Sequence, residues 1–265
     1  MTISPQLVDA FRDDGAVRLA GVFRDWVETL RRGIERNLAE PGPYQRLYTP
    51  QGGSGRFVGD YCNWARIPEY RAFVFESPAA GIARQLMGSR TARFFHEHVL
   101  VKEPGTREPT PWHHDQPYYC VDGKQNVSLW IPLDRVAKEI CVEFVAGSHR
   151  WGRWFRPRKF TGIAYDHKTD TLEDMPDISA HRADYRLLSW DVEPGDAIAF
   201  TFLTVHGAAG NLSPNRRRAF AARWLGDDAV YAVRPGEISP PFPGLDRRLK
   251  PGEPMAAEEF PLVLG

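Results

Sequence analysis

The segment Trp112-His113-His114-Asp115-Gln116 decides how the rest of the chain is interpreted. In an extended chain, residues two apart project to the same side, so His113 and Asp115 can reach one metal ion while His114 points away. One imidazole and one carboxylate fill two adjacent coordination positions, so a third ligand must come from elsewhere in the chain. Alone the tripeptide is a weak signal, because short His/Asp pairs often serve only as hydrogen-bonding groups.

The best candidate for the third ligand is His206, which follows the apolar run Ala197–Val205. A histidine at the end of a buried strand is expected at the mouth of a barrel, where functional residues concentrate. Two histidines and one carboxylate on one face of a metal are the ligand set of non-haem Fe(II) oxygenases. His96 and His98 alternate on a strand shortly before the motif, and spacing alone leaves open a zinc site that uses them.

An arginine-rich turn follows His206. The segment Gly207–Pro214 is rich in turn residues, which lets the next strand, Arg218–Leu225, return antiparallel beside the strand of His206. The run Arg216–Arg218 then stands near the metal end of the barrel. A planar guanidinium grips a carboxylate through two parallel hydrogen bonds, which suits the distal carboxylate of 2-oxoglutarate. The alternative is a solvated turn of three arginines.

The remaining sequence indicates a β-rich fold behind a helical N-terminal region. Short apolar or alternating runs separated by Pro/Gly turns favour an all-β sandwich or barrel, and strands are expected at Ala16–Leu19, Arg93–Val101, Val127–Leu133, Cys141–Val145, Ala197–Val205 and Arg218–Leu225. Helices are expected from Ser4-Pro5 to Asp14, from Asp25 to Leu38 and over Ala79–Met87, with a loop at Gln51–Gly59. One domain over 1–265 is expected, with a mostly helical region 1–90, a jelly-roll core 91–230 that carries a polar insert 150–189, and a tail 231–265.

Composition and charge exclude several classes. The chain has 265 residues with 34 Lys+Arg against 34 Asp+Glu, so nothing points to nucleic acid or a membrane surface as a partner. Cys62, Cys120 and Cys141 form no CxxC pair, which makes a disulfide framework unlikely and a cytoplasmic location the expectation. No signal peptide and no apolar run of about 18 residues is found, so no transmembrane helix is expected.

The ordered set of motifs resembles the phytanoyl-CoA dioxygenase family of Fe(II)- and 2-oxoglutarate-dependent oxygenases. The matching pieces are Phe11–Val17, Val101–Gly105, Trp112–Asp115, Ser128–Asp134, Phe144–His149, Pro194–Asp196 and His206–Arg217. Each piece is weak alone, but their order and spacing are specific and span nearly the whole chain. The resemblance implies a mainly β fold, a double-stranded β-helix or jelly roll, with flanking N-terminal α-helices.

The same resemblance implies roles for individual residues. It makes His113, Asp115 and His206 the iron ligands, with Arg217, Trp130 and His98 around the co-substrate. No catalytic residue beyond the metal ligands is implied. The cofactors are then Fe(II), 2-oxoglutarate and O2, and the expected reaction hydroxylates a C–H bond of a small organic molecule while 2-oxoglutarate becomes succinate and CO2. The carboxylate ligand argues against halogenation, since a halogenating subgroup lacks it.

Other outcomes stay open from sequence alone. The same cofactors can support desaturation, epimerisation or cyclisation, and a non-oxygenase metal cupin or a binding barrel without turnover are further alternatives. Residues expected near the substrate are Tyr118, Tyr119, Arg153, Trp154 and Arg156. The basic, aromatic run Arg150–Lys159 opens the insert, and a cationic rim there would favour an anionic substrate. A solvated basic loop is the alternative.

Overall fold

The computed structural model describes residues 1–157 and 172–265. In these residues the α-helices are α1 Pro5–Asp14, α2 Val27–Ala39, α3 Pro68–Glu76 and α4 Ala79–Met87. Short 3-10 helices are η1 Arg24–Trp26, η2 Gln116–Tyr118, η3 Lys138–Ile140, η4 Ser148–Arg150, η5 Arg182–Asp184 and η6 Leu245–Arg247. The strands are β1 Ala16–Leu19, β2 Arg46–Leu47, β3 Phe57–Tyr61, β4 Ala92–Lys102, β5 Thr110–His113, β6 Val121–Asp122, β7 Asn126–Pro132, β8 Val142–Val145, β9 Leu187–Leu188, β10 Ala197–Phe200, β11 His206–Ala208, β12 Arg217–Leu225, β13 Val230–Tyr231 and β14 Leu262–Leu264. No helix in the described ranges is long and apolar enough to cross a membrane.

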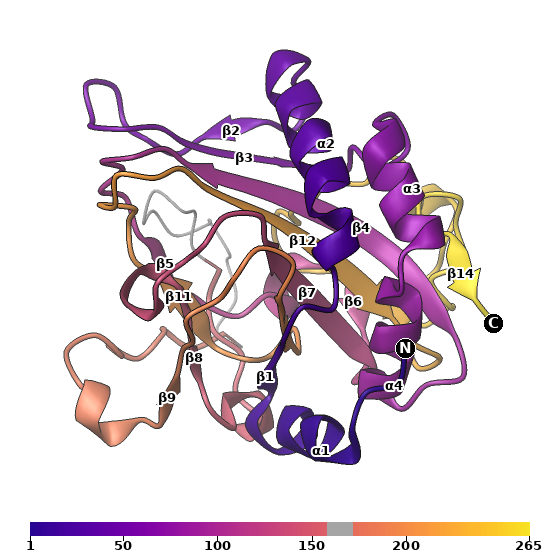
Figure 1. The fold of residues 1–265 in the computed structure, drawn as a ribbon. Helices are drawn as coiled ribbons and strands as arrows, with labels where there is room; N and C mark the ends of the chain where they lie inside the picture. Colours follow the sequence, from indigo (N-terminus) through magenta and orange to yellow (C-terminus); the bar gives the residue numbers. More distant parts are fainter. Residues whose placement is uncertain (158–171) are drawn as a thin grey trace.

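Two antiparallel sheets form the body of the molecule. The larger has the order β1-β10-β7-β12-β4-β3-β2, with β14 also paired to β4, and the smaller has the order β5-β11-β8-β9. Consecutive strands such as β10 and β11 lie in different sheets, so the chain crosses between the sheets as it does in a jelly roll. The fold is therefore mainly β and has the double-stranded β-helix architecture that the sequence predicted. Figure 1 shows the smaller sheet at the lower left and the helices along the outer side of the larger sheet.

Side chains of the larger sheet alternate between the helices and a cavity. On β4, Val99 and Val101 belong to the core beneath the helices, whereas His98 and Lys102 line the cavity. On β12, Phe220 packs against Tyr70 of α3 at 4.8 Å between ring centroids. Because successive residues of a strand face opposite sides, one sheet supplies both the hydrophobic core and the polar wall of the cavity.

The N-terminal elements follow their local signals. The Ser4 side chain accepts a hydrogen bond from the Leu7 backbone N–H at the start of α1, and Gly15 ends the helix in the left-handed conformation at φ 79°. A Cβ on Gly15 would lie 2.3 Å from Nδ1 of His149, so glycine is also required there for space. The predictions of helices at α1 and α4 and of a strand at β1 are confirmed.

Two sequence predictions of local structure were wrong. The run Ala197–Val205 is not one strand, because β10 ends at Phe200 and the next residues form a turn before β11 begins. The turn is apolar because Phe202 is fully buried in a second core cluster, which periodicity cannot distinguish from a strand. The loop expected up to Gly59 is also too long, since β3 starts at Phe57 and pairs with β4; helix α3 was missed.

The strand after the arginine-rich turn pairs differently from the prediction. Strand β12 does not lie beside β11 but pairs with β4 and β7 in the other sheet. The turn between them is held by the buried Asn211, whose side-chain N–H groups donate to the Lys102 and Asn215 carbonyls at 2.9 and 2.7 Å. This crossover brings the start of β12 and the end of β4 together at one end of the cavity.

Candidate metal centre

Three buried side chains converge where β5 meets β11. His206 is directly opposite His113 in the antiparallel register, with ring centroids 4.2 Å apart, and Asp115 follows β5. Ligand atoms of these three residues all lie within 4.8 Å of one another, and no other such group of three is found in the described parts of the chain. His96 and His98 line the same cavity but do not join this cluster, so the zinc alternative built on them has no support there.

The structural route to this cluster differs from simple strand alternation. Asp115 lies beyond the end of β5 in a helical conformation, φ −75° and ψ −34°, where it precedes η2. His206 begins β11 rather than ending the preceding strand. His114 does point away, as expected, and its Nε2 accepts a hydrogen bond from the Phe155 backbone N–H at 2.9 Å. Burial lowers the pKa of His114 to about 4, so it is a neutral structural residue.

The protonation states suit a divalent cation. Nδ1 of His113 lies 2.8 Å from the Pro111 carbonyl, and Nδ1 of His206 lies 2.9 Å from the Thr204 carbonyl. A carbonyl oxygen only accepts, so each Nδ1–H donates to it, and each Nε2 is directed toward the centre. Burial and then His113 lower the pKa of His206 to about 3. Burial alone would raise the pKa of Asp115, but Arg223 and the His113 hydrogen bond outweigh it and hold that pKa well below its usual range.

The cluster opens into a cavity of about 400 Å³, which is large enough for a small organic ligand. Of the residues that the sequence placed near the co-substrate, Arg217, Trp130 and His98 all line it. Burial lowers the pKa of His98 to about 3, so this ring is neutral. Trp130 is the neighbour of Ala221 across the β7–β12 pair, which places its ring on the cavity side of the sheet.

One end of the cavity holds two buried basic side chains. Arg217 donates hydrogen bonds to the carbonyls of Ile140 and Ala209, and no carboxylate lies within ion-pairing distance of it among the described residues. Lys102, its register partner on β4, donates to the Glu108 and Ala209 carbonyls at 2.9 and 3.0 Å. The amine of Lys102 and the guanidinium of Arg217 thus both donate to the Ala209 carbonyl oxygen. Burying the guanidinium of Arg217 without an anion is costly, which marks this end as a site for an anion.

Only part of the predicted substrate set reaches the cavity. Tyr118 and Tyr119 line it, whereas Arg153, Trp154 and Arg156 do not. Arg153 pairs with Glu173, Arg156 lies 3.6 Å from Asp174, and the Trp154 ring stacks under the guanidinium of Arg234 at 5.1 Å. The cationic rim expected from the insert is therefore not formed by these residues, because acids of the same insert neutralise them. Arg158 and Lys159 of the basic run lie outside the described residues.

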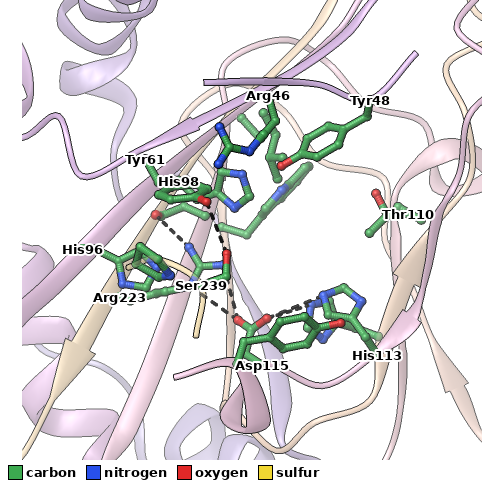
Figure 2. Close-up of a pocket in the computed structure, with 18 of the residues that line it drawn as sticks. Arg46, Tyr48, Tyr61, His96, His98, Thr110, His113, Asp115, Arg223 and Ser239 are labelled. Atoms are coloured by element: carbon green, nitrogen blue, oxygen red, sulfur yellow. Dashed lines mark hydrogen bonds and ion pairs between the residues drawn. The ribbon is translucent and has the colours of Figure 1, made fainter. Parts of the chain in front are cut away.

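Several cavity residues were missed by sequence reasoning. They are Arg46, Tyr48, Tyr61, Thr110, Arg223 and Ser239, which Figure 2 shows around the open space beside His113 and Asp115. Arg223 could have been found, because it lies on the same face of β12 as Arg217, six residues later. Ser239 gave no signal, since the segment that carries it is an irregular part of the chain beyond the sheets.

Comparison of the sequence with family profiles decides the relationship. The profile described as Phytanoyl-CoA dioxygenase (PhyH) matches residues 11–219. The chain belongs to the phytanoyl-CoA dioxygenase family. Members of this family are iron- and 2-oxoglutarate-dependent non-haem oxygenases, and the buried His/Asp/His cluster agrees with that class. This chain is accordingly an enzyme of that class, although the family does not fix the reaction that it catalyses.

Solved structures support the same assignment. The α-ketoglutarate-dependent carbocyclase SnoK from nogalamycin biosynthesis is 27% identical with a TM-score of 0.77, over 99% of this chain and 97% of SnoK. The epimerase SnoN, solved with Fe3+ and α-ketoglutarate, is 23% identical with a TM-score of 0.76, over 97% of each chain. EctD from S. alaskensis, solved with 2-oxoglutarate and 5-hydroxyectoine, is 20% identical with a TM-score of 0.71, over 99% of this chain and 87% of EctD. SnoN and EctD show that this chain has the same fold as they do. No curated protein gives a significant sequence match.

Proposed function

We propose that this phytanoyl-CoA dioxygenase family member binds Fe(II) through His113, Asp115 and His206 and oxidises a small organic molecule with 2-oxoglutarate and O2. The observation that carries the proposal is the combination, in one cavity, of a buried His/Asp/His ligand set with a buried arginine that has no acidic partner among the described residues. Two nitrogens and one oxygen are donors that Fe(II) accepts, and three ligands on one face leave positions for a chelating keto acid.

The cavity also fits the second charge of the co-substrate. 2-Oxoglutarate carries a distal carboxylate, and at one end of the cavity Arg217 supplies a cation and Lys102 supplies a second hydrogen-bond donor. Between Arg217 and Arg223 the cavity face of β12 carries only Ala219 and Ala221, which leave room above the sheet for an extended ligand. Arg217 would bind the distal carboxylate through parallel hydrogen bonds, and Trp130 would bound the chain of the ligand.

When bound, iron supplies the O2 chemistry, and the protein orients the reactants and excludes water. The Nδ1–H groups of the two histidines donate to backbone carbonyls, which fixes both rings in the orientation that ligation requires. Tyr118 and Tyr119 are more than nine-tenths buried, so the wall beside His113 is largely closed to solvent. We assign no acid–base residue beyond the ligands.

Hydroxylation is the reaction that we propose first. The carboxylate ligand Asp115 occupies the position that a halide needs in halogenating relatives, which argues against halogen transfer. The alternative is desaturation, epimerisation or cyclisation with the same cofactors. One observation favours it: SnoK, which is 27% identical over nearly the whole chain, is described as a carbocyclase. Both outcomes require the same iron and 2-oxoglutarate chemistry and differ only in what happens to the substrate.

We infer that the substrate is a small organic molecule, and we propose no nucleic acid or membrane partner. If the substrate is charged, Arg46 and Glu237 are the residues that would interact with the charge. These two side chains line the cavity, whereas Arg153 and Arg156 are neutralised by acids of the insert. Arg46 donates to the Gln45 carbonyl and has no acidic partner among the described residues. The proposal that the substrate is anionic therefore depends on Arg46. A cytoplasmic location also remains a prediction.

Succinate release tests the proposal. The purified protein is incubated with Fe(II), 2-oxoglutarate and ascorbate against a panel of small metabolites that contains matched anionic and neutral members. Succinate above the substrate-free background, together with an oxidised product found by mass spectrometry, is the expected result. Substrate turnover that continues without 2-oxoglutarate, or with zinc in place of iron, would contradict the proposal and favour a non-oxygenase metal cupin.

Lys102 predicts a pH dependence of co-substrate binding. Burial and then Arg217 lower its pKa to about 6, so the free protein holds this amine mostly neutral above that pH. A bound carboxylate favours the charged amine, so binding at pH 7.5 should take up a proton and weaken as the pH rises from 6. Calorimetric titration of the anaerobic iron-loaded protein in phosphate and in Tris, buffers with different ionisation enthalpies, measures this uptake as a difference in apparent binding enthalpy.

Lys102→Met is the control for this titration. It should remove the difference between the two buffers and weaken 2-oxoglutarate binding less than loss of Arg217 does. Lys102 and Arg217 both contact the Ala209 carbonyl, but only the guanidinium can form two parallel hydrogen bonds. Equal apparent enthalpies for the unsubstituted protein in both buffers would mean that Lys102 does not change protonation on binding.

A further inference from the structure

A second buried arginine, Arg223, lies against the carboxylate of Asp115. Its Nη2 and Nε atoms are 3.3 and 3.4 Å from Oδ2 of Asp115, and both side chains are 6% exposed. Figure 2 shows the guanidinium beside His96 and Ser239, with the ion pair drawn to Asp115 below it. Arg223 lies beyond residues 11–219, the segment that the family profile matches. Neither the ligand set nor the co-substrate cations account for this residue.

The two oxygens of Asp115 face different partners. Oδ1 lies 3.5 Å from Nε2 of His113 and 3.9 Å from Nε2 of His206, so this oxygen faces the centre of the ligand cluster. Oδ2 faces away from the histidines and toward Arg223. The carboxylate is thus already divided into one oxygen for a metal and one oxygen for the guanidinium.

Arg223 has no competing acidic partner in the described ranges. It also donates a hydrogen bond from Nη1 to the Ala221 carbonyl at 3.4 Å and contacts Tyr119, whose ring centroid is 5.7 Å from the guanidinium carbon. The Tyr119 side chain forms hydrogen bonds with both Arg223 and Asp115, so it joins the same group of contacts. Burying a guanidinium costs several kcal/mol unless an anion compensates. The pKa of Arg223 is nevertheless raised: burial lowers it, and Tyr119 and Asp115 more than offset that effect. The pair with Asp115 is therefore specific.

We propose that Arg223 is a positioning residue that holds Oδ2 of Asp115, so that this carboxylate ligates iron through Oδ1 alone. The inference rests on the proposed function. A carboxylate can bind a metal through one or both oxygens. If Oδ2 were released, it could turn onto the metal and occupy a position that the keto-acid end of 2-oxoglutarate needs. Arg223 thereby keeps the metal open to its co-substrate without touching the co-substrate.

Arg223→Met tests this role, because methionine keeps much of the volume but removes the charge and the hydrogen bonds. Metal affinity should be nearly unchanged, since Oδ2 then adds a metal contact. The affinity of the metal-loaded protein for 2-oxoglutarate should fall at least about 10-fold, because Oδ2 then competes with the keto acid for a coordination position. Anaerobic titrations with Fe(II), then with 2-oxoglutarate, measure both constants, and the visible charge-transfer band should reach full intensity only at higher 2-oxoglutarate concentration.

Arg223→Lys and Arg218→Met are the matched variants. Lysine keeps a cation near Oδ2 and should recover part of the lost affinity; if the methionine variant does not fold, the lysine variant still tests the proposal through its own weaker 2-oxoglutarate binding. Arg218 pairs with Asp134 outside the cavity, so its loss should leave the 2-oxoglutarate affinity unchanged.

Two results would overturn the role of Arg223. One is a folded Arg223 variant with unchanged 2-oxoglutarate affinity. The other is a variant that loses metal and 2-oxoglutarate affinity in parallel, because general support of the site would then explain it. If the unsubstituted protein itself fails to bind 2-oxoglutarate when loaded with metal, the proposed function fails, and that result is distinct from both.

Discussion

Asp115→Ala is expected to abolish the weak visible band that Fe(II) and 2-oxoglutarate give together under anaerobic conditions, and to reduce succinate release to background. The carboxylate is the only anion in the described ligand cluster, so its loss removes one donor and the charge that balances the cation. The band requires a keto acid chelated to iron, so it reports the assembled centre rather than turnover. An absorption titration of the anaerobic protein checks the prediction.

This substitution also leaves Arg223 buried without an anion, which is expected to destabilise the fold by about 3–5 kcal/mol. His206→Ala is therefore needed beside it, because it removes a ligand that is neutral in the folded protein and leaves no charge unpaired. His181→Ala, at an exposed histidine just before η5, is the control and should leave the band intact. A full-intensity band in both ligand variants would show that the metal lies elsewhere.

Arg217→Ala is expected to weaken 2-oxoglutarate binding far more than iron binding. Truncating one partner of a buried, hydrogen-bonded charge pair costs roughly 2–5 kcal/mol, or about 30- to 5,000-fold in affinity. A high 2-oxoglutarate concentration should restore part of the turnover rate, so the substitution should act mainly on the KM for the co-substrate. Anaerobic calorimetry, first with Fe(II) added to the metal-free protein and then with 2-oxoglutarate added to the iron-loaded protein, measures the two binding constants.

The neighbouring arginines provide controls in the same turn. Arg216 pairs with Glu35 and Glu103, and Arg218 pairs with Glu35 and Asp134, so their loss should change stability and leave 2-oxoglutarate affinity within a few fold. They differ from Arg217 because successive side chains of a strand face opposite sides. Similar losses of affinity in all three variants would favour a diffuse electrostatic effect over a specific clamp.

The sequence predicted the members of the ligand cluster better than their geometry. His113, Asp115 and His206 do converge, but Asp115 reaches the cluster from a helical turn and His206 from the start of a strand. The apolar run Ala197–Val205 misled because a buried turn and a buried strand have the same composition. Only the crossover between sheets, which depends on long-range pairing, separates the two possibilities.

Strand alternation was the signal that predicted most. The family resemblance pointed to Arg217, and strand alternation explains why this side chain faces the cavity; extended along β12, alternation would also have placed Arg223 there. It could not reveal that Arg223 contacts Asp115, because those residues are 108 positions apart and meet only through the fold. For Arg153 and Arg156, local charge density was misleading because acids of the same insert pair with them.

The wall of the cavity that Ile238, Ser239, Pro240 and Pro241 contribute has a consequence for engineering the substrate range. These residues lie outside the segment 11–219 that is shared with the family, whereas the three ligands and Arg217 lie inside it. A change of side chain in this wall therefore alters the space beside the metal ligands without replacing a ligand. Exchanging this segment between relatives is accordingly a more promising route to altered substrate range than substitution within the barrel.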